Sequence, residues 1–424
     1  MFLIFFRKIY MKGIKEMRPK RRTILAVNHP TAFLDPAMIG SFSKPTQNFL
    51  LRGDVFSSPV TRWLLRQIHT IPIFRFRDGF SSLKNNQSTF EYCYDLLKQK
   101  EYLLVLAEGQ TKFEKRLRPI QKGTARMAFG AYEKYQLDDI EVLPVGVNYT
   151  DAAKSRSVMM VEVGTAIPLS NYMEAYQENP RKAIKQMTDE ISRQLKNLVV
   201  HVQADEDAQF ADQVLDIHRN DLVGWSNWPV LEHSNVLLRA EVQLAKQINQ
   251  LPEERKAPLR EKCSDYFHIL KNKQLRDDTL MRPKIYNWLN SLILLLTAIP
   301  ALIGYAVHYP AVWLSRNIAD GKVKRKEFYT SIRYGVMLFG TLFYYLLFLL
   351  PIGLLLIGKA SLLVLPLLLL MGYGSIHWRE LYDRWSAARR YVHLSKEERE
   401  NLQSMRQLII DEIKQLKAAG KVSV

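Results

Sequence analysis

Cysteine is scarce in this sequence, and the short spacings that hold metal ions are missing. Cys93 and Cys263 are the only two cysteines among 424 residues, and they lie far apart. Two isolated cysteines supply neither a disulfide framework nor a zinc site. Folds stabilised by either device are therefore disfavoured, and a reducing compartment fits best.

The N-terminus lacks a long apolar run. Only residues 2–6 are apolar before Arg7 and Lys8, which is too short for the apolar core of a secretory signal. Bulky apolar residues then alternate with basic ones as far as Lys15. This pattern favours a segment that lies at a membrane surface, and a first helix packed on the core is the alternative.

Acidic residues are too few to balance the basic ones. The chain has 60 Lys and Arg against 42 Asp and Glu, which gives a formal net charge of +18. Such an excess favours anionic partners: nucleic acid, acidic lipid headgroups, or phosphorylated small molecules. No nucleic-acid-binding motif is recognisable, and basic residues beside apolar runs account for the charge. We therefore expect no nucleic-acid partner.

Residues 1–200 predict an α/β domain, because strand-like and helical patterns alternate there. Strands are expected at 23–29, 69–76, 102–109, 141–150 and 158–169, and helices at 88–100 and 124–136. Several of these strands are nearly continuous apolar runs, as in a sheet covered on both faces. His29, Arg75 and Glu108 come where such runs end, and open α/β sheets bind ligands at the carboxyl ends of their strands.

The rest of the chain changes in composition near residue 284. Residues 201–283 are charged and helical in pattern, and we expect a helical connector there. Residues 284–378 predict a membrane region, with a transmembrane hairpin formed by the uncharged runs at 334–357 and 360–376. The run at 284–310 is interrupted by Pro300, so we expect it to be re-entrant or spanning.

The basic flanks of the apolar runs indicate their orientation. Lys and Arg cluster before residue 288, between 316 and 333, and again from 379 to 390. If all three clusters are cytoplasmic, as such clusters usually are, the α/β domain and the C-terminal helix at 379–424 lie on the cytoplasmic side. The protein is then a multi-pass or hairpin-anchored membrane protein.

The stretch "LAVNHPTAFLDPAMIG" (25–40) holds His29 and Asp35 in an HxxxxxD spacing. One interpretation is a plain turn, with Asp35 as the N-cap of a helix and Pro36 in its first position. The other is a dyad, in which Asp35 orients an imidazole that acts as a base. The backbone between them must be irregular for the two side chains to meet, because residues six apart do not share a helix face.

Three further stretches carry candidate substrate-binding residues. Arg75 and Arg77 share one face at a strand end, which suits a phosphate, although surface arginines are the alternative. Glu108 and Gly109 end another strand; the carboxylate could hold a substrate hydroxyl or an arginine, and the glycine permits close backbone approach. Pro144 interrupts a strand, which indicates an edge strand or a bent wall of the active site.

In this order, Asn28-His29 with Asp35, then 71–75, then Glu108-Gly109, then 143–147, the sequence resembles the glycerolipid acyltransferase family over roughly residues 5–170. The family includes glycerol-3-phosphate and 1-acylglycerol-3-phosphate acyltransferases. The resemblance implies an α/β acyltransferase domain with a mixed sheet flanked by helices. It also implies that His29 is the base, Asp35 its partner, and Arg75 a phosphate ligand.

Some residues depart from the family pattern. Five residues separate His29 from Asp35 where four are commoner, and His69 stands where the second motif usually begins with glycine. Gln110 and Thr111 follow Glu108-Gly109 in place of Thr-Arg. The candidates to replace that missing arginine are Arg116, Arg118 and Lys122.

The resemblance implies transfer of a fatty acyl group from a thioester, on coenzyme A or acyl carrier protein, to a hydroxyl of glycerol-3-phosphate or its 1-acyl form. Such a transfer needs no cofactor or metal, and its partners are the lipid bilayer, a phosphate-bearing acceptor and the thioester donor. Acylation of another lysophospholipid is an alternative. A non-catalytic membrane scaffold, in which His29 is dispensable, is a second alternative.

Overall fold

The structure is a computed structural model that describes residues 2–74, 85–222 and 229–421. One sheet dominates the N-terminal half, with strand order β4-β3-β5-β2-β6-β7-β1-β9 and β8 paired to β6. The strands are β1 Lys8–Lys12, β2 Thr23–Val27, β3 Gln47–Arg52, β4 Thr70–Ile73, β5 Tyr102–Leu106, β6 Glu141–Tyr149, β7 Val158–Val163, β8 Ile167–Pro168 and β9 Val230–Glu232. The pairs among β2 to β6 are parallel, so the carboxyl ends of these strands share one edge.

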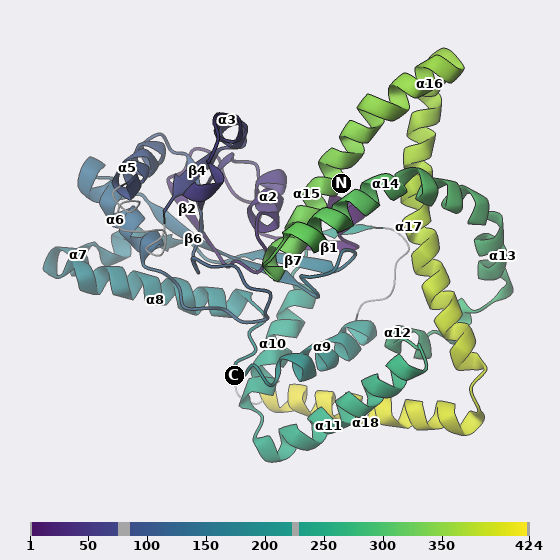
Figure 1. Ribbon diagram of the computed structural model, residues 1–424. Helices are drawn as coiled ribbons and strands as arrows, with labels where there is room; N and C mark the ends of the chain where they lie inside the picture. Colours follow the sequence, from purple (N-terminus) through teal and green to yellow (C-terminus); the bar gives the residue numbers. More distant parts are fainter. Residues whose placement is uncertain (1, 75–84, 223–228, 422–424) are drawn as a thin grey trace.

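Helices cover both faces of this sheet (Figure 1). Ile24 and Ala26 of β2 face a core that also contains residues of α5 (Asn85–Lys98), α6 (Gly123–Tyr135) and α8 (Pro180–Leu198). The alternate residues Leu25 and Val27 face a second core with α2 (Leu34–Phe42). Such alternation follows from the two-residue period of a strand. The expected α/β fold with a mixed sheet flanked by helices is confirmed.

The N-terminal segment differs from both interpretations of its sequence. The short helix α1 (Phe2–Phe5) leads into strand β1, which lies inside the sheet between β7 and β9. Ile9 and Met11 enter the same core as Leu25, whereas Tyr10 points to the opposite side. The alternation of apolar and basic residues therefore reflects the period of a buried strand, because the neighbouring strands supply hydrogen bonds on both sides.

A helical lobe follows the α/β domain in the chain. It consists of α9 (Ala208–Leu222), α10 (Val236–Gln250), α11 (Glu253–Asn272), α12 (Asp277–Leu280) and, from the C-terminus, α18 (Lys396–Lys421). The apolar stripe of α18 is buried in this lobe, at Leu402, Ile409, Ile413 and Leu416. A buried ion pair between Arg406 Nε and Asp277 Oδ1, at 2.7 Å, joins α18 to α12. The α/β domain and the lobe are continuous, because β9 extends the sheet.

The apolar helices lie between these elements in the sequence. They are α13 (Trp288–Leu296), α14 (Ala298–Lys322), α15 (Lys326–Tyr344), α16 (Leu350–Ile357) and α17 (Ser361–Val392). The helical stretch Lys326–Val392 is long and apolar enough to cross a membrane, and α13 with α14 meets the same test as a pair bent by 48°. That bend falls at Thr297, just before Pro300, because a proline ring clashes with the carbonyl four residues earlier. In Figure 1, α16 and α17 meet at a tip, where the chain reverses at Gly358–Ala360.

Candidate active site

His29 and Asp35 lie in contact at the carboxyl end of β2. The imidazole Nδ1 of His29 is 3.1 Å from Oδ2 of Asp35. Residues 28–33 have no regular structure, and this irregular turn lets the two side chains meet. The N-cap interpretation of Asp35 is wrong. Helix α2 begins at Leu34 with Phe33 as its N-cap, so Asp35 lies inside the first turn and its carboxylate is free to accept other hydrogen bonds.

The carboxylate of Asp35 is completely buried and surrounded by donors. Besides facing His29, Oδ2 accepts a hydrogen bond from the backbone N–H of Thr31 at 3.0 Å. Oδ1 accepts from the Thr31 hydroxyl at 2.6 Å and from the Tyr149 hydroxyl at 2.8 Å. Hydrogen bonds to a carboxylate favour its charged form and hold it in one orientation. Burial, followed by the charge of Asp35, raises the pKa of Tyr149, so its hydroxyl stays a donor.

The second ring nitrogen of His29, Nε2, makes no hydrogen bond to any residue in the described part of the chain. The side chain of His29 keeps 11% of its surface exposed, whereas that of Asp35 has none. If Nδ1–H donates to Asp35, Nε2 carries the lone pair. An unprotonated nitrogen without a hydrogen-bond partner, on an imidazole held in one orientation, is the arrangement that a general base requires.

The turn that carries His29 is fixed to the sheet on one side by Asn28. Its amide donates from Nδ2 to the carbonyl of Val147 at 2.9 Å and accepts at Oδ1 from the N–H of Val147 at 2.7 Å. Beyond the last backbone pair of β2 and β6, the side-chain amide of Asn28 thus takes the place of a backbone partner for β6. Tyr149, two residues further along β6, is thereby held against the dyad.

Glu108 lies beside the same turn, just beyond the end of β5. Its carboxyl group is buried, and it accepts a hydrogen bond from the backbone N–H of His29. Burial raises the pKa of Glu108 to about 8, and the hydrogen bond and the charge of Arg118 only partly oppose that rise. Gly109 follows with φ of +68°, a conformation that favours glycine.

The basic run after Gly109 divides into two groups. Lys115 forms an ion pair with Asp212, and Arg116 bonds to Asp205 at 2.9 Å, so both join the α/β domain to the helical lobe. Arg118 pairs instead with a residue of its own loop, since its Nε donates to Oε1 of Glu114 at 2.6 Å. Its positive charge also lowers the pKa of Glu108. Of the three candidates for the missing arginine, Arg118 is therefore placed best, since Lys122 is exposed at the start of α6.

Two groups of expected substrate-binding residues are not seen beside the dyad. Arg75 and Arg77 lie within residues 75–84, which are outside the described residues. Pro144 lies within β6 opposite Ala26, and β6 is flanked by β2 and β7. The expectation that Pro144 marks an edge strand is therefore wrong. Its missing N–H is tolerated because the neighbour of β6 on that side changes from β8 to β7 at this residue.

Helix α15 of the apolar region borders the dyad turn. The ring of Phe33 lies so near Gly335 that a Cβ there would stand 3.2 Å from it. Thr330 donates to the carbonyl of Ala152 at 2.8 Å, and Arg325 donates to the carbonyl of Thr111 at 3.1 Å. The apolar helices thus contact the α/β domain at the edge that carries His29.

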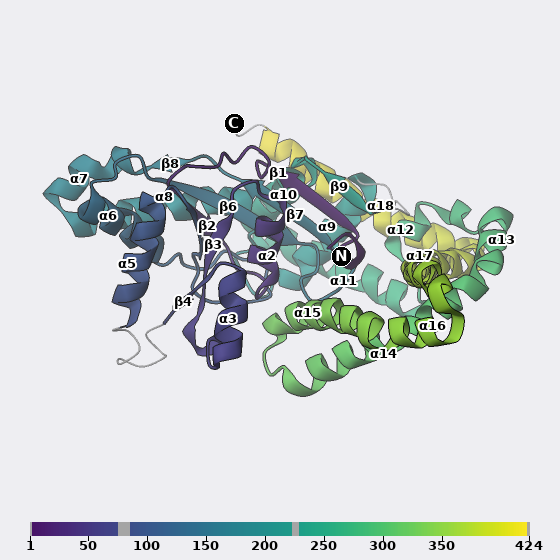
Figure 2. The same ribbon diagram turned by 90° about the horizontal axis from the view of Figure 1, so that it is seen from above.

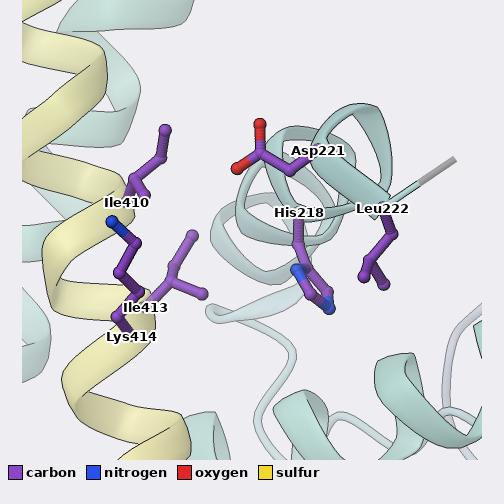
Figure 3. A pocket seen from close by; sticks show the side chains of 6 residues that line it. All are labelled: His218, Asp221, Leu222, Ile410, Ile413 and Lys414. Carbon is purple, nitrogen blue, oxygen red and sulfur yellow. The ribbon is translucent and has the colours of Figure 1, made fainter. Parts of the chain in front are cut away.

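A small open hollow occurs elsewhere, in the helical lobe. Figure 3 shows His218, Asp221 and Leu222 of α9 facing three residues of α18, namely Ile410, Ile413 and Lys414. None of these side chains belongs to the dyad or to the strand ends around it. Within the described residues, no group of three or more His, Cys, Asp and Glu side chains could hold a metal ion.

Thr31 and Tyr149 are site residues that the sequence did not single out. Thr31 lies between His29 and Asp35, and its hydroxyl and N–H both serve the carboxylate. A Thr two residues after the His is a signal that could have been used. Tyr149 is 114 residues from Asp35, and only the register of β6 brings it near.

The α/β domain is similar in sequence to known proteins. Residues 8–148 match the model of the family described as Acyltransferase. This match and the relatives that follow support the glycerolipid acyltransferase family for the α/β domain. Glycerol-3-phosphate O-acyltransferase 1 of Saccharomyces cerevisiae is 27% identical over 124 residues, which cover 28% of this chain and 16% of the yeast enzyme. Glycerol-3-phosphate O-acyltransferase 2 of the same yeast is 30% identical over 112 residues, which cover 26% of this chain and 15% of that protein.

These matches cover about a quarter of this chain, and the chain spans about a sixth of the length of these curated relatives. Among solved structures, the 1-acyl-sn-glycerophosphate acyltransferase of Thermotoga maritima aligns with a TM-score of 0.33 and 14% identity. That alignment covers 45% of this chain and 73% of the other.

Proposed function

We propose that this chain is a membrane-bound O-acyltransferase of phospholipid biosynthesis. It transfers a fatty acyl group from an acyl thioester to a hydroxyl of glycerol-3-phosphate or of 1-acylglycerol-3-phosphate. The observation that carries the proposal is the contact between His29 Nδ1 and Asp35 Oδ2 at 3.1 Å, with Nε2 left open. It lies inside a domain of the matching family.

In the proposed reaction, His29 Nε2 takes the proton of the acceptor hydroxyl as the oxygen attacks the thioester carbonyl. Asp35 holds the ring and stabilises the imidazolium that forms. When the tetrahedral intermediate collapses, the C–S bond breaks and the thiolate takes the proton from the imidazolium. The products are an ester and a free thiol. No serine nucleophile is needed, because the attacking oxygen belongs to the substrate.

Basic side chains would bind the phosphate of the acceptor. Arg75 and Arg77 follow β4 in the sequence, and Arg118 lies near Glu108 beyond β5. Because β4, β3, β5 and β2 pair in parallel, the carboxyl ends of these strands share one edge of the sheet. Guanidinium groups suit a phosphate monoester, because their paired N–H donors match its oxygens.

The apolar helices are proposed to lie in the membrane. With α13 to α17 in the bilayer and the α/β domain on its cytoplasmic side, an acyl chain could reach the dyad along α15. The basic clusters at both ends of the apolar runs support this orientation. Anionic lipids would also attract the basic domain.

An assay of detergent-solubilised protein tests the proposal. Glycerol-3-phosphate and its monoacyl form are offered separately, each with an acyl-coenzyme A and an acyl-acyl carrier protein. His29→Ala and Asp35→Asn should lower kcat by on the order of a hundredfold or more, because a positioned general base contributes that much. A His29→Ala protein that folds and keeps full activity would leave the scaffold alternative. Activity confined to another lysophospholipid would reassign the acceptor.

A further inference from the structure

Helix α3 (Pro59–Gln67) presents its apolar side to the outside of the protein. None of its residues is buried. Val60 is 66% exposed, Trp63 61% and Leu64 53%, and Ile68, which ends the helix, is 55% exposed. At 100° per residue these four side chains share one face. A surface helix of a globular protein normally turns its apolar face toward the core. Helix α3 turns its apolar face toward the outside instead.

The orientation of α3 is set by local hydrogen bonds on its other face. Ser58 and Thr61 form a reciprocal capping box, in which each side chain bonds to the backbone N–H of the other at 3.1 Å. Thr70 donates to the carbonyl of Leu65 at 2.7 Å and ties the helix to β4. Thr61 and Leu65 are half-buried. The helix is therefore held to the domain along the side that carries Thr61 and Leu65, and the face with Val60, Trp63 and Leu64 stays outward.

Two arginines flank the apolar face. Arg62 and Arg66 are exposed, and in the part of the chain that the structure describes neither makes an ion pair. They lie one turn apart; Arg66 is next to Trp63, and Arg62 lies further round the helix from the apolar face. An exposed apolar face with a tryptophan and exposed basic residues beside it is complementary to an anionic lipid surface.

The position of α3 agrees with such a partner. Figure 2 shows α3 on the same side of the molecule as α14, α15 and α16, whereas α7 (Met173–Glu178), α8 and α18 lie toward the opposite side. Helix α3 also follows β3, so it begins at the edge of the sheet that carries the dyad.

We propose that α3 is an interfacial helix. Its apolar face enters the surface of the bilayer that holds the apolar helices, and Arg62 and Arg66 bind anionic headgroups there. The inference rests on the membrane location in the proposed function and adds a second point of attachment on the catalytic domain itself. This attachment holds the edge with His29 against the lipid surface.

The test places a fluorophore on α3 in the full chain. Trp63→Cys is labelled with an environment-sensitive dye, since Cys93 and Cys263 are buried. The protein is reconstituted in phosphatidylcholine and phosphatidylserine vesicles that contain lipids brominated near the headgroup. The dye at position 63 should be strongly quenched. The matched control, Lys185→Cys on α8, is also exposed and should not be quenched.

Equal quenching at the two positions, or none at position 63, overturns the proposal. If the dye at position 63 is shielded from water but is not quenched by brominated lipid, a second copy of the chain covers α3. That result also overturns the proposal. The double variant Arg62→Gln/Arg66→Gln should weaken the quenching in phosphatidylserine vesicles and leave it unchanged in purely zwitterionic ones. The quenching does not depend on catalysis, so its failure is distinguishable from a failure of the acyltransferase proposal.

A functional readout completes the test. Leu64→Glu should lower the rate on membrane-embedded 1-acyl acceptor by about tenfold, because the charged side chain removes the apolar contact with lipid. With glycerol-3-phosphate and a short-chain thioester in detergent, the same variant should match the unmodified protein. An equal loss in both assays would mean a damaged fold and would contradict a role of α3 at the lipid surface.

Discussion

The carboxyl group of Glu108 accepts a hydrogen bond from the backbone N–H of His29. This contact joins the turn after β2 to the turn after β5, two strands that are direct neighbours in the sheet. His29 is therefore held from two directions, by the carboxylate of Asp35 on its ring and by Glu108 on its backbone. Glu108 differs from Asp35 because it has few donors around it, and burial favours its neutral form.

Glu108 should make the protein less stable as the pH rises. Its pKa is about 8 in the folded protein, against a reference value of 4.5. Between these values the folded state holds a proton that the unfolded state has lost, so the free energy of unfolding falls as pH increases, by an amount on the order of 5 kcal/mol at most. Glu108→Gln should remove this dependence, because the amide oxygen still accepts from His29 and does not titrate.

Thermal unfolding of the detergent-solubilised protein between pH 5 and pH 9 checks this. The Tm of the Glu108→Gln variant should exceed that of the unmodified protein at pH 9, and the two should converge near pH 5. Glu178→Gln, an exposed glutamate at the end of α7, is the control for the same chemical change. Parallel Tm profiles for Glu108→Gln and the unmodified protein would contradict the role of burial.

Tyr149 is predicted to be a positioning residue for the dyad. Its hydroxyl donates to Asp35 Oδ1 at 2.8 Å from a buried site. Removing a hydrogen bond to a charged group costs about 1.5–3 kcal/mol, so Tyr149→Phe should lower kcat by about tenfold or more. The KM for the acceptor should change little, because Tyr149 contacts Asp35 and not the substrate.

Steady-state kinetics with varied acceptor separate these effects. Tyr102→Phe is the matched control, since its buried hydroxyl donates to the carbonyl of Arg18 rather than to the dyad. A merely structural role for Tyr149 would make the two variants alike: each would lose stability, and neither would lose kcat once folded. That outcome would remove Tyr149 from the site.

The sequence predicted the strand ends of the site well. Buried parallel strands are continuous apolar runs, so the points where polar residues interrupt them are visible, as at His29 and Glu108. The strands end slightly earlier than expected, at Val27 and Leu106, and the polar residues lie just outside the sheet. The irregular turn between His29 and Asp35 also followed from their spacing and Pro30.

Other parts could not be predicted, because they depend on contacts between distant segments. The alternation around Ile9 is equally consistent with a surface segment and with a buried strand, and only the partners β7 and β9 decide between them. The contact of Tyr149 with Asp35 needs the register of β6 against β2. For α3, the sequence shows which face is apolar, and only the structure shows that this face points outward.

Arg118 is predicted to bind the acceptor phosphate in place of the arginine missing after Gly109. It lies close enough to Glu108 for its charge to act on that carboxyl group, whereas Arg116 is bound to Asp205 and to the carbonyl of Val202. Arg118→Ala should raise the KM for a phosphate-bearing acceptor by about tenfold, the effect of one charge-assisted hydrogen bond, and leave kcat nearly unchanged.

Arg116→Ala serves as the comparison for Arg118→Ala, because it removes the same charge two positions earlier in the chain. It should lower the Tm, because it breaks a connection between the α/β domain and the helical lobe, and it should leave the KM as it is. If both variants raise the KM equally, the effect is one of net charge. The phosphate would then be bound by other residues.

Gly304 is predicted to set the closeness of α14 and α17. A Cβ at Gly304 would lie 2.2 Å from the carbonyl oxygen of Met371, and a Cβ at Gly372 would lie 2.3 Å from the ring of His308. The atoms that a Cβ at Gly304 would meet belong to the backbone of α17, which cannot move aside as a flexible side chain can. Gly304→Ala should therefore force the two helices apart. Overpacking of this kind costs about 1–3 kcal/mol, and interfaces of small residues are typical of helices packed in membranes.

The measurement is the Tm in detergent and again in lipid nanodiscs. Gly304→Ala should lower the Tm by several degrees in both. The matched control is Gly374→Ala on α17, where an added Cβ meets nothing within 4 Å. It should leave the Tm unchanged or raise it slightly, because alanine is the better helix former. If Gly304→Ala proves as harmless as Gly374→Ala, then α14 and α17 are not packed through their backbones.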